Sequence, residues 1–289
     1  MAGPKTIQLF LMDGTGQGRM KATLRNWTGI TYLLPRTDIH LSKDRKDLKQ
    51  TGVYLLFGED DEGTPKVYIG QARLRKNEKG VLGRIMEHLG DDRLDYWTHA
   101  IALVTSDDSF GPTEISYLEN RFVNMAIKAS RYTVTNSNDP SVGRVTEEKQ
   151  AELDEFIKYA RLVIGALGYR VFEPVDDAKD PETKQSASPP LSMSIAGAEA
   201  KGRQTNDGFV VLAGAKLRHE ASFTPSAPKS VRKNRSKHAD KIGPNSILIQ
   251  DIQFSSPTAA AQFVGGASLN GLDMWKNSAG KSLKQLERE

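Results

Sequence analysis

Residues 52–57 read GVYLLF, and residues 67–70 read VYIG. Both runs are short and apolar and contain β-branched and aromatic residues, which is typical of β-strands. The segment between them, residues 58–66, is rich in turn-forming residues. Two short strands separated by such a segment form a hairpin. We therefore expect a hairpin that brings Tyr54 and Tyr68 to one edge of a sheet.

Alternating or helical spacing of apolar residues extends this unit in both directions. The sequence predicts strands before the hairpin at 6–12 and 30–34, a short helix or tether at 41–50, and a strand after it at 97–105. It predicts helices at 81–89, at 113–129 with Thr113 as its cap, and at 146–167 before Gly168. The glycine-rich residues 13–18 follow a strand, but too short a segment comes next for the helix of a dinucleotide-binding loop. The expected fold class is α+β, with a small sheet flanked by helices.

Four polar residues follow the hairpin at suggestive spacings. Arg84 and His88 are four residues apart on the predicted helix 81–89 and therefore share a face. Glu119 lies inside the helix 113–129, and Asn136 lies in the polar loop beyond it. Each of these residues alone has an ordinary structural explanation, as a solvated or packing side chain. Their order behind two tyrosine-bearing strands is more specific.

The chain here resembles the GIY-YIG nuclease superfamily. The matching residues, in order, are Gly52-Val53-Tyr54, Tyr68-Ile69-Gly70, Arg84, His88, Glu119 and Asn136. The resemblance covers about ninety residues, has Val53 where the family name has isoleucine, and has a somewhat long hairpin connection. It implies a metal-dependent endonuclease that hydrolyses DNA phosphodiester bonds.

The resemblance also implies a role for each residue. Glu119 would bind one Mg²⁺ or Mn²⁺ ion, with substrate phosphate and water completing the shell. Arg84 would contact the phosphate. Tyr54 would be the general base or part of its relay, Tyr68 and His88 would orient water or phosphate, and Asn136 would brace the site. A phenol needs nearby cations to act as a base near neutral pH.

Composition excludes several other classes. The 289 residues contain no cysteine, so disulfides and thiolate metal sites are absent. No apolar run is long enough to cross a bilayer, and the start of the sequence lacks the apolar core of a secretory signal. We therefore expect a cytoplasmic protein with no membrane partner. The net charge of +4 alone says little about partners.

Positive charge is concentrated between residues 216 and 241. Arg232, Lys233, Arg235 and Lys237 are the candidate DNA contacts in this stretch, because clustered cations release counterions from phosphates. The alternative is a solvated loop that keeps the protein soluble. Phe209, Phe254, Phe263 and Trp275 are more consistent with core packing than with base stacking.

We expect four parts in the chain. They are an N-terminal β-rich subdomain at 1–50, a nuclease domain with a trailing helix at 51–172, a linker at 173–192 and a small α+β accessory domain at 193–289. The first part resembles the leader of a bacterial subgroup of these nucleases. The last resembles a small domain of unknown function that is often appended to nucleases and restriction-modification proteins.

Two alternatives stay open at this stage. The first is a catalytically inactive nucleic-acid-binding protein on a nuclease fold, and the second is an adaptor whose basic loop contacts another protein. Restriction, phage defence, repair and mobile-element maintenance are equally compatible settings, and RNA stays open as a substrate. One such site cuts one strand at a time, so double-strand cleavage requires a homodimer or a second event.

Overall fold

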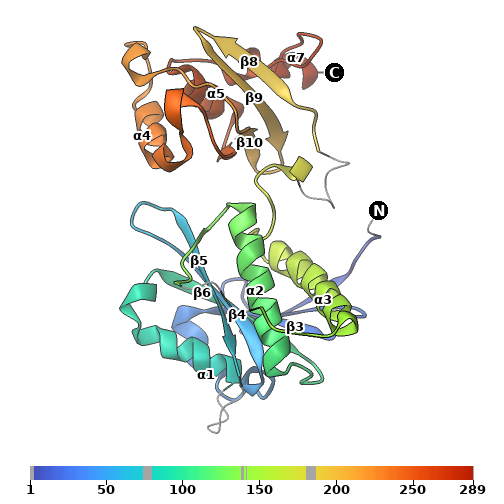
Figure 1. Cartoon of the computed structure of the whole chain (residues 1–289). Coiled ribbons are helices and arrows are strands. Elements are labelled where there is room, and N and C mark those ends of the chain that lie inside the picture. Colours follow the sequence, from blue (N-terminus) through green and yellow to red (C-terminus); the bar gives the residue numbers. More distant parts are fainter. Residues whose placement is uncertain (1–2, 74–79, 138–139, 141, 180–186, 289) are drawn as a thin grey trace. The chain divides into compact units, whose positions relative to one another are not determined.

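The computed structural model describes residues 3–73, 80–137, 140, 142–179 and 187–288. The chain divides into two compact units, Met1–Glu173 and Pro174–Glu289 (Figure 1). Both units combine helices with a sheet, so the α+β class is confirmed. In the described residues no helix is both long and apolar enough to cross a membrane.

The N-terminal unit is built on a seven-stranded sheet in the order β1-β2-β3-β6-β4-β5-β7. Its strands are β1 (Ile7–Leu11), β2 (Met20–Leu24), β3 (Gly29–Pro35), β4 (Gly52–Glu59), β5 (Pro65–Ala72), β6 (Trp97–Thr105) and β7 (Thr133–Val134). All neighbours are antiparallel except β5 and β7. The predicted hairpin is the β4–β5 pair, in which Tyr54 lies opposite Gly70.

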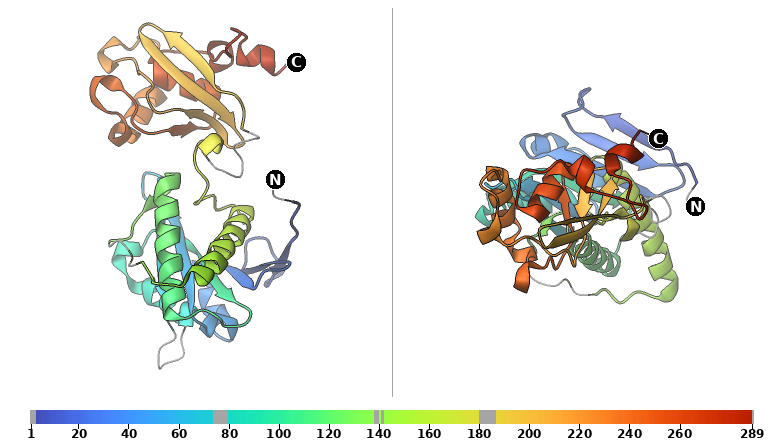
Figure 2. Two further views of the ribbon diagram at one scale, coloured as in Figure 1. Left: turned by 45° about the vertical axis from the view of Figure 1, so that its right-hand side comes forward. Right: turned by 90° about the horizontal axis from the view of Figure 1, so that it is seen from above.

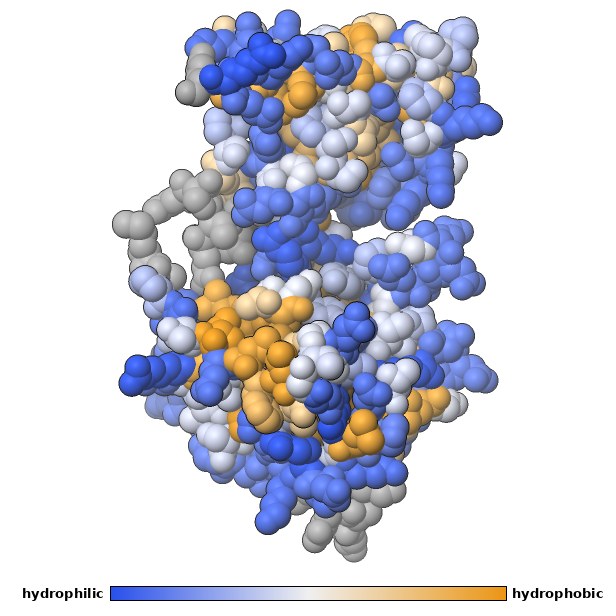
Figure 3. Space-filling model, turned by 180° about the vertical axis from the view of Figure 1, so that it is seen from behind, coloured by the Kyte–Doolittle hydropathy of each residue, from blue (hydrophilic) through white to orange (hydrophobic). Residues whose placement is uncertain are grey.

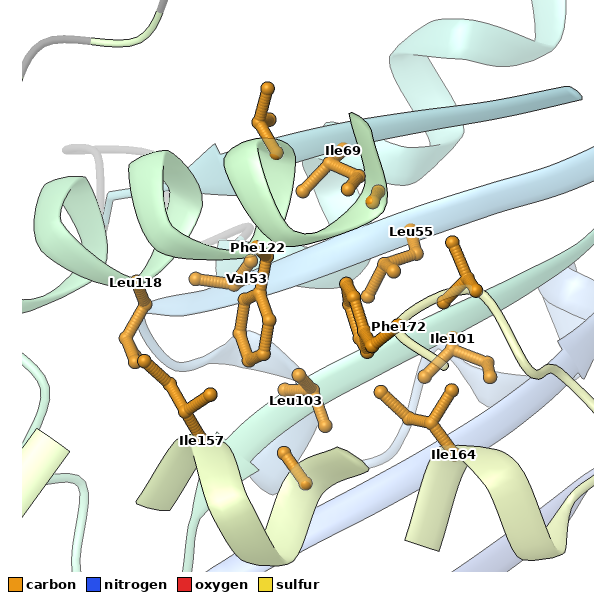
Figure 4. Packing of buried hydrophobic residues seen from close by; sticks show 14 of the residues in the cluster. Val53, Leu55, Ile69, Ile101, Leu103, Leu118, Phe122, Ile157, Ile164 and Phe172 are labelled. Carbon is orange, nitrogen blue, oxygen red and sulfur yellow. The ribbon is translucent and has the colours of Figure 1, made fainter. Parts of the chain in front are cut away.

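The two faces of this sheet are covered by different helices, because successive side chains of a strand point to opposite faces. Helices α2 (Pro112–Ala129) and α3 (Glu147–Ala166) cover one face. Figure 4 shows Phe122 of α2 and Ile157 of α3 directed toward Leu103 of the sheet. Helix α1 (Gly80–Glu87) packs on the other face, among the residues that include Tyr54 and Leu56. Tyr54 therefore faces α1, whereas its neighbour Val53 faces α2.

The C-terminal unit has a four-stranded antiparallel sheet in the order β11-β10-β9-β8. Its strands are β8 (Leu191–Ile195), β9 (Ala198–Thr205), β10 (Gly208–Val211) and β11 (Ile252–Phe254). Its helices are α4 (Lys229–Lys237), α5 (Pro257–Gly265), α6 (Gly271–Met274) and α7 (Leu283–Leu286). Phe209, Phe254, Phe263 and Trp275 are buried in its core, as the sequence indicated.

Several local predictions differ from the structure. Residues 229–237 form a helix and not a loop, and β8 begins inside the predicted linker, of which residues 180–186 lie outside the described part. The segment 41–50 contains the end of one 3-10 helix, Arg36–Ser42, and the whole of another, Asp47–Lys49. Thr113 does not cap α2, because the N-cap is Gly111 and Pro112 occupies the first turn.

Candidate functional site

Three aromatic side chains form the centre of the candidate site. Tyr54 comes from β4, Tyr68 from β5, and His88 from the turn that follows α1. The Tyr54 hydroxyl lies 2.8 Å from Nε2 of His88. The Tyr68 ring centroid is 5.2 Å from that of His88 and 6.2 Å from that of Tyr54. The hairpin and the helix therefore bring these three predicted residues together.

Gly70 makes room for this arrangement. It lies opposite Tyr54 in the β4–β5 ladder, and the Tyr54 phenol lies across its Cα. A Cβ atom at position 70 would overlap the Tyr54 hydroxyl and its ring carbon. The glycine of the second triplet is thus required by the position of the tyrosine of the first.

Arg84 lies beside the same hydroxyl. Its guanidinium donates a hydrogen bond to Glu87 Oε2 at 2.6 Å. Its charge and a hydrogen bond also act on Tyr54, where they lower the pKa of the phenol. One face of α1 therefore supplies a fixed positive charge next to a proton-carrying group.

Burial dominates the protonation of the central pair. Burial raises the pKa of Tyr54 above its ordinary value, and the neighbouring Tyr68 raises it further, against the effect of Arg84. Burial, followed by the charge of Arg84, lowers the pKa of His88. At neutral pH the phenol is protonated and the imidazole is neutral. Nε2 of His88 shares this hydrogen bond with the Tyr54 hydroxyl, and Nδ1 lies 3.9 Å from the Asp91 carboxylate.

Glu119 lies on α2, on the opposite side of the sheet from the tyrosines. Its Oε2 atom accepts a hydrogen bond from Nε2 of Gln71 on β5 at 2.9 Å. Burial raises the pKa of Glu119, while Gln71 and the charges of Arg73 and Arg84 act to lower it. The charge of Arg84 therefore acts on the pKa values of both Tyr54 and Glu119.

Asn136 fastens the edge of β5. Its Oδ1 accepts from the backbone N–H of Ile69 at 3.1 Å, and its Nδ2 donates to the Ile69 carbonyl at 2.7 Å. This pair continues the ladder of β7, which reaches only Lys66 and Val67. Asn136 therefore holds the backbone of the second triplet without contacting its side chains through these bonds.

The six predicted residues thus surround one stretch of β5, with the phenols and imidazole on the α1 face and the carboxylate on the α2 face. Sequence reasoning missed Gln71, Arg73 and Asp91, which contact or bias Glu119 and His88. Gln71 directly follows Gly70, and the alternation of a strand places it on the face opposite Gly70. The alternation of the strand could therefore have identified Gln71 from the sequence.

The predicted divalent cation requires oxygen ligands near Glu119. In the described part of the chain no three His, Asp or Glu residues cluster as a metal site. Glu119 is the carboxylate that the resemblance assigns to the ion. Such a carboxylate fits a hydrated Mg²⁺ ion that is bound jointly with a substrate phosphate, because Mg²⁺ retains waters and often takes one or two carboxylates.

The four basic candidates on α4 do not share one environment. Arg232, Lys233 and Lys237 are exposed. Arg235 is buried, and its guanidinium donates to the carbonyl of Phe263 at 2.8 and 2.6 Å and to that of Val264 at 3.3 Å. Arg235 therefore binds the C-terminal end of α5 and is not presented to a ligand.

The C-terminal part of the chain matches a known protein family. Residues 191–287 match the family described as "Domain of unknown function (DUF4357)". This confirms that the C-terminal region is similar to a small domain of unknown function. No curated protein and no solved structure matches the chain.

Proposed function

We propose that the N-terminal unit is a GIY-YIG-type endonuclease that hydrolyses DNA phosphodiester bonds with one divalent cation. The observation that carries this proposal is the contact between the Tyr54 hydroxyl and Nε2 of His88, with Arg84 beside it and Glu119 on the adjoining helix. Six residues that are spread over 83 positions of the sequence, from 54 to 136, lie around one strand. Packing alone does not require this combination of polar groups.

Tyr54 and His88 would move the proton of the attacking water. The phenol accepts that proton as its own proton passes to Nε2 of His88, so Tyr54 need not be ionised beforehand. The neutral imidazole is suited to this step because its pKa lies below the ordinary value. Asp91 faces Nδ1 and would stabilise the imidazolium that results.

Arg84 and Glu119 would act on the phosphate. Arg84 offers a planar pair of donors for two phosphate oxygens, at a position that also faces Tyr54. Glu119, oriented by Gln71, would hold the cation. When bound, the cation would neutralise charge on the phosphoryl oxygens.

The binding-only alternative has one observation in its favour. Tyr54 is fully buried, with an exposed fraction of 0%. A phenol in this position reaches a water only if the surrounding side chains, chiefly Tyr68 and Arg84, rearrange on DNA binding. A chain that never makes this change would bind nucleic acid without cutting it.

Cleavage of supercoiled plasmid tests the proposal. With Mg²⁺ or Mn²⁺, we expect the wild type to nick or linearise the DNA, and Glu119→Gln and Tyr54→Phe to bind with unchanged affinity but cut at least about 100-fold more slowly. Glu114→Gln, on the same helix, and Tyr159→Phe are the matched controls and should cut normally. If the wild type binds DNA and RNA but cuts neither, and EDTA changes nothing, the binding-only alternative replaces the proposal.

A further inference from the structure

Arg36 holds the segment that carries His88, residues 88–97, which we call the His88 turn. Arg36 directly follows β3 and begins the first 3-10 helix. Its guanidinium donates to three backbone carbonyls of this turn, those of Leu89, Asp95 and Trp97, at 3.2, 2.8 and 3.1 Å. One side chain therefore holds both ends of the turn against the end of β3.

Arg36 also contacts the tryptophan ring that hydrogen-bonds His88. The Cζ atom of Arg36 lies 4.8 Å from the centre of the Trp97 ring, and Trp97 is buried. A cation over the face of an indole ring is attracted by the charge distribution of the ring. Nε1 of Trp97 donates to the carbonyl of His88 at 3.4 Å. Arg36 thus acts on the His88 turn through its backbone and through a ring that contacts His88 itself.

Arg36 is the link between the N-terminal strands and the His88 turn. Among the described residues before β4, no other side chain hydrogen-bonds this turn. β1 lies at the margin of its sheet in both views of Figure 2, and its Leu9, Phe10 and Leu11 side chains are exposed. Figure 3 shows apolar surface gathered on one face of this unit. β3 lies inside the sheet, between β2 and β6, so the residue that follows it reaches the turn that leads into β6.

We propose that Arg36 is a positioning residue for His88, through which the part of the chain before β4 serves the candidate site. Among the described residues, no hydrogen bond joins Arg36 to Tyr54 or to the His88 ring, so it acts through the His88 turn. The contact that it controls is the 2.8 Å hydrogen bond between Nε2 of His88 and the Tyr54 hydroxyl. Because the His88 ring is buried, a shift of its turn changes both this contact and the burial of the ring. The effect on cleavage rests on the proposed nuclease function, whereas the position of the ring does not.

The titration of the His88 ring reports its position without any cleavage. Burial lowers the pKa of this ring, so a turn that moves outward raises it. In the full-length chain we expect Arg36→Lys to raise the pKa of His88 toward 6.5, because lysine keeps the charge but lacks the planar fork that spans the three carbonyls. NMR of the imidazole across a pH series measures this, and His88→Gln identifies the signal. The variant keeps every charged or titratable group that faces the ring, namely Arg84, Glu87, Asp91, Arg93, Tyr54 and Tyr68.

Arg19→Lys is the matched control, because Arg19 also lies before β4 but binds Asp13 and Ser42. It should leave the titration of His88 as in the wild type. Plasmid cleavage is scored separately: Arg36→Lys should lower kcat at least about tenfold and leave KM for DNA unchanged. An unchanged His88 titration in Arg36→Lys, or an equal change in Arg19→Lys, overturns the positioning role whatever the cleavage rate. A raised pKa in Arg36→Lys alone supports it, even where the wild type cuts no DNA and the nuclease function fails.

Discussion

At the scale of single residues, Gly70 determines whether the candidate site can form. The Tyr54 phenol lies against the Cα atom of Gly70, and any side chain at position 70 would overlap the hydroxyl. Tyr54 cannot retreat, because it is buried and lies 2.8 Å from His88. Position 70 therefore requires glycine for a steric reason, which is the place that the Tyr54 ring occupies.

We expect Gly70→Ala to separate Tyr54 from His88. Stability should fall by about 1–3 kcal/mol, as in other overpacked cores, and plasmid cleavage should fall at least about 100-fold because the proton path is broken. Denaturant unfolding and the cleavage assay measure the two effects. Gly90→Ala, where an added methyl group meets no atom, is the matched control. Normal cleavage by Gly70→Ala would separate the Tyr54–His88 contact from catalysis.

Residue identity and residue contact were predictable to different degrees. The sequence predicted that Tyr54, Tyr68, Arg84 and His88 lie close together, because the hairpin and an i, i+4 pair restrict where they lie. The orientation of Glu119 by Gln71, and the burial of Tyr54, depend on how α2 packs across the sheet. Those contacts join residues about 50 positions apart, and no local pattern specifies them.

At the scale of elements, helix α4 shows why a charge cluster is ambiguous in sequence. Val231 and Arg235, four residues apart, are its buried residues, so the helix has no apolar stripe that would distinguish it from a loop. The β8–β9 hairpin was missed for a related reason. Its turn is Ala196-Gly197, with φ values of 48° and 78°, and alanine is a weak signal for such a turn.

The basic residues of α4 are expected to divide into two phenotypes. Arg235→Met removes the donors to the Phe263 and Val264 carbonyls and should destabilise the C-terminal unit by about 2–4 kcal/mol. Replacing Arg232, Lys233 and Lys237 with glutamine should leave stability within about 0.5 kcal/mol. If α4 contacts DNA, that triple variant should reduce the salt slope of binding by about 2–3.

Thermal unfolding and binding at four salt concentrations separate these phenotypes. The comparison is between Arg235→Met and the triple variant, which change basic residues of the same helix. A triple variant with unchanged affinity and unchanged salt slope would remove α4 from the DNA interface.

At the scale of the whole molecule, the two units are expected to respond differently to acid. His238 of the C-terminal unit packs against the edges of Phe254 and Phe263. Burial, with the charges of Lys241 and Lys237, lowers its pKa from 6.5 to about 4. Between these two values the unfolded chain binds a proton that the folded unit does not. The stabilising effect of the neutral ring is therefore complete above pH 6.5 and is lost as the pH falls toward 4.

We expect the C-terminal unit to lose about 1–2 kcal/mol of stability over this range, since solvent screens part of the effect at a half-buried ring. Hydrogen exchange of peptides from residues 191–287, corrected for intrinsic rates, reports on this unit alone. His238→Gln should lose less stability over the same range, whereas His219→Gln, at an exposed position, should behave as the wild type. Equal pH dependence in all three proteins would exclude His238 as the cause.

For the N-terminal unit, the sequence predicted which strands form better than the order in which they pair. Every strand of the N-terminal sheet except β2 and β7 was expected near its observed bounds, because alternation and turn residues mark them. The position of β6 between β3 and β4 was not predicted, because strand order depends on pairing between residues far apart in the sequence.

Asn136 has a consequence for solubility as well as for the site. A strand edge with free N–H and C=O groups templates the addition of foreign strands, which is how soluble sheets begin to aggregate. The carboxamide of Asn136 engages both groups of Ile69, at the point where β7 ends and the edge of β5 would otherwise lie open. Because a single side chain cannot be extended as a strand can, it blocks further growth of the sheet at this point.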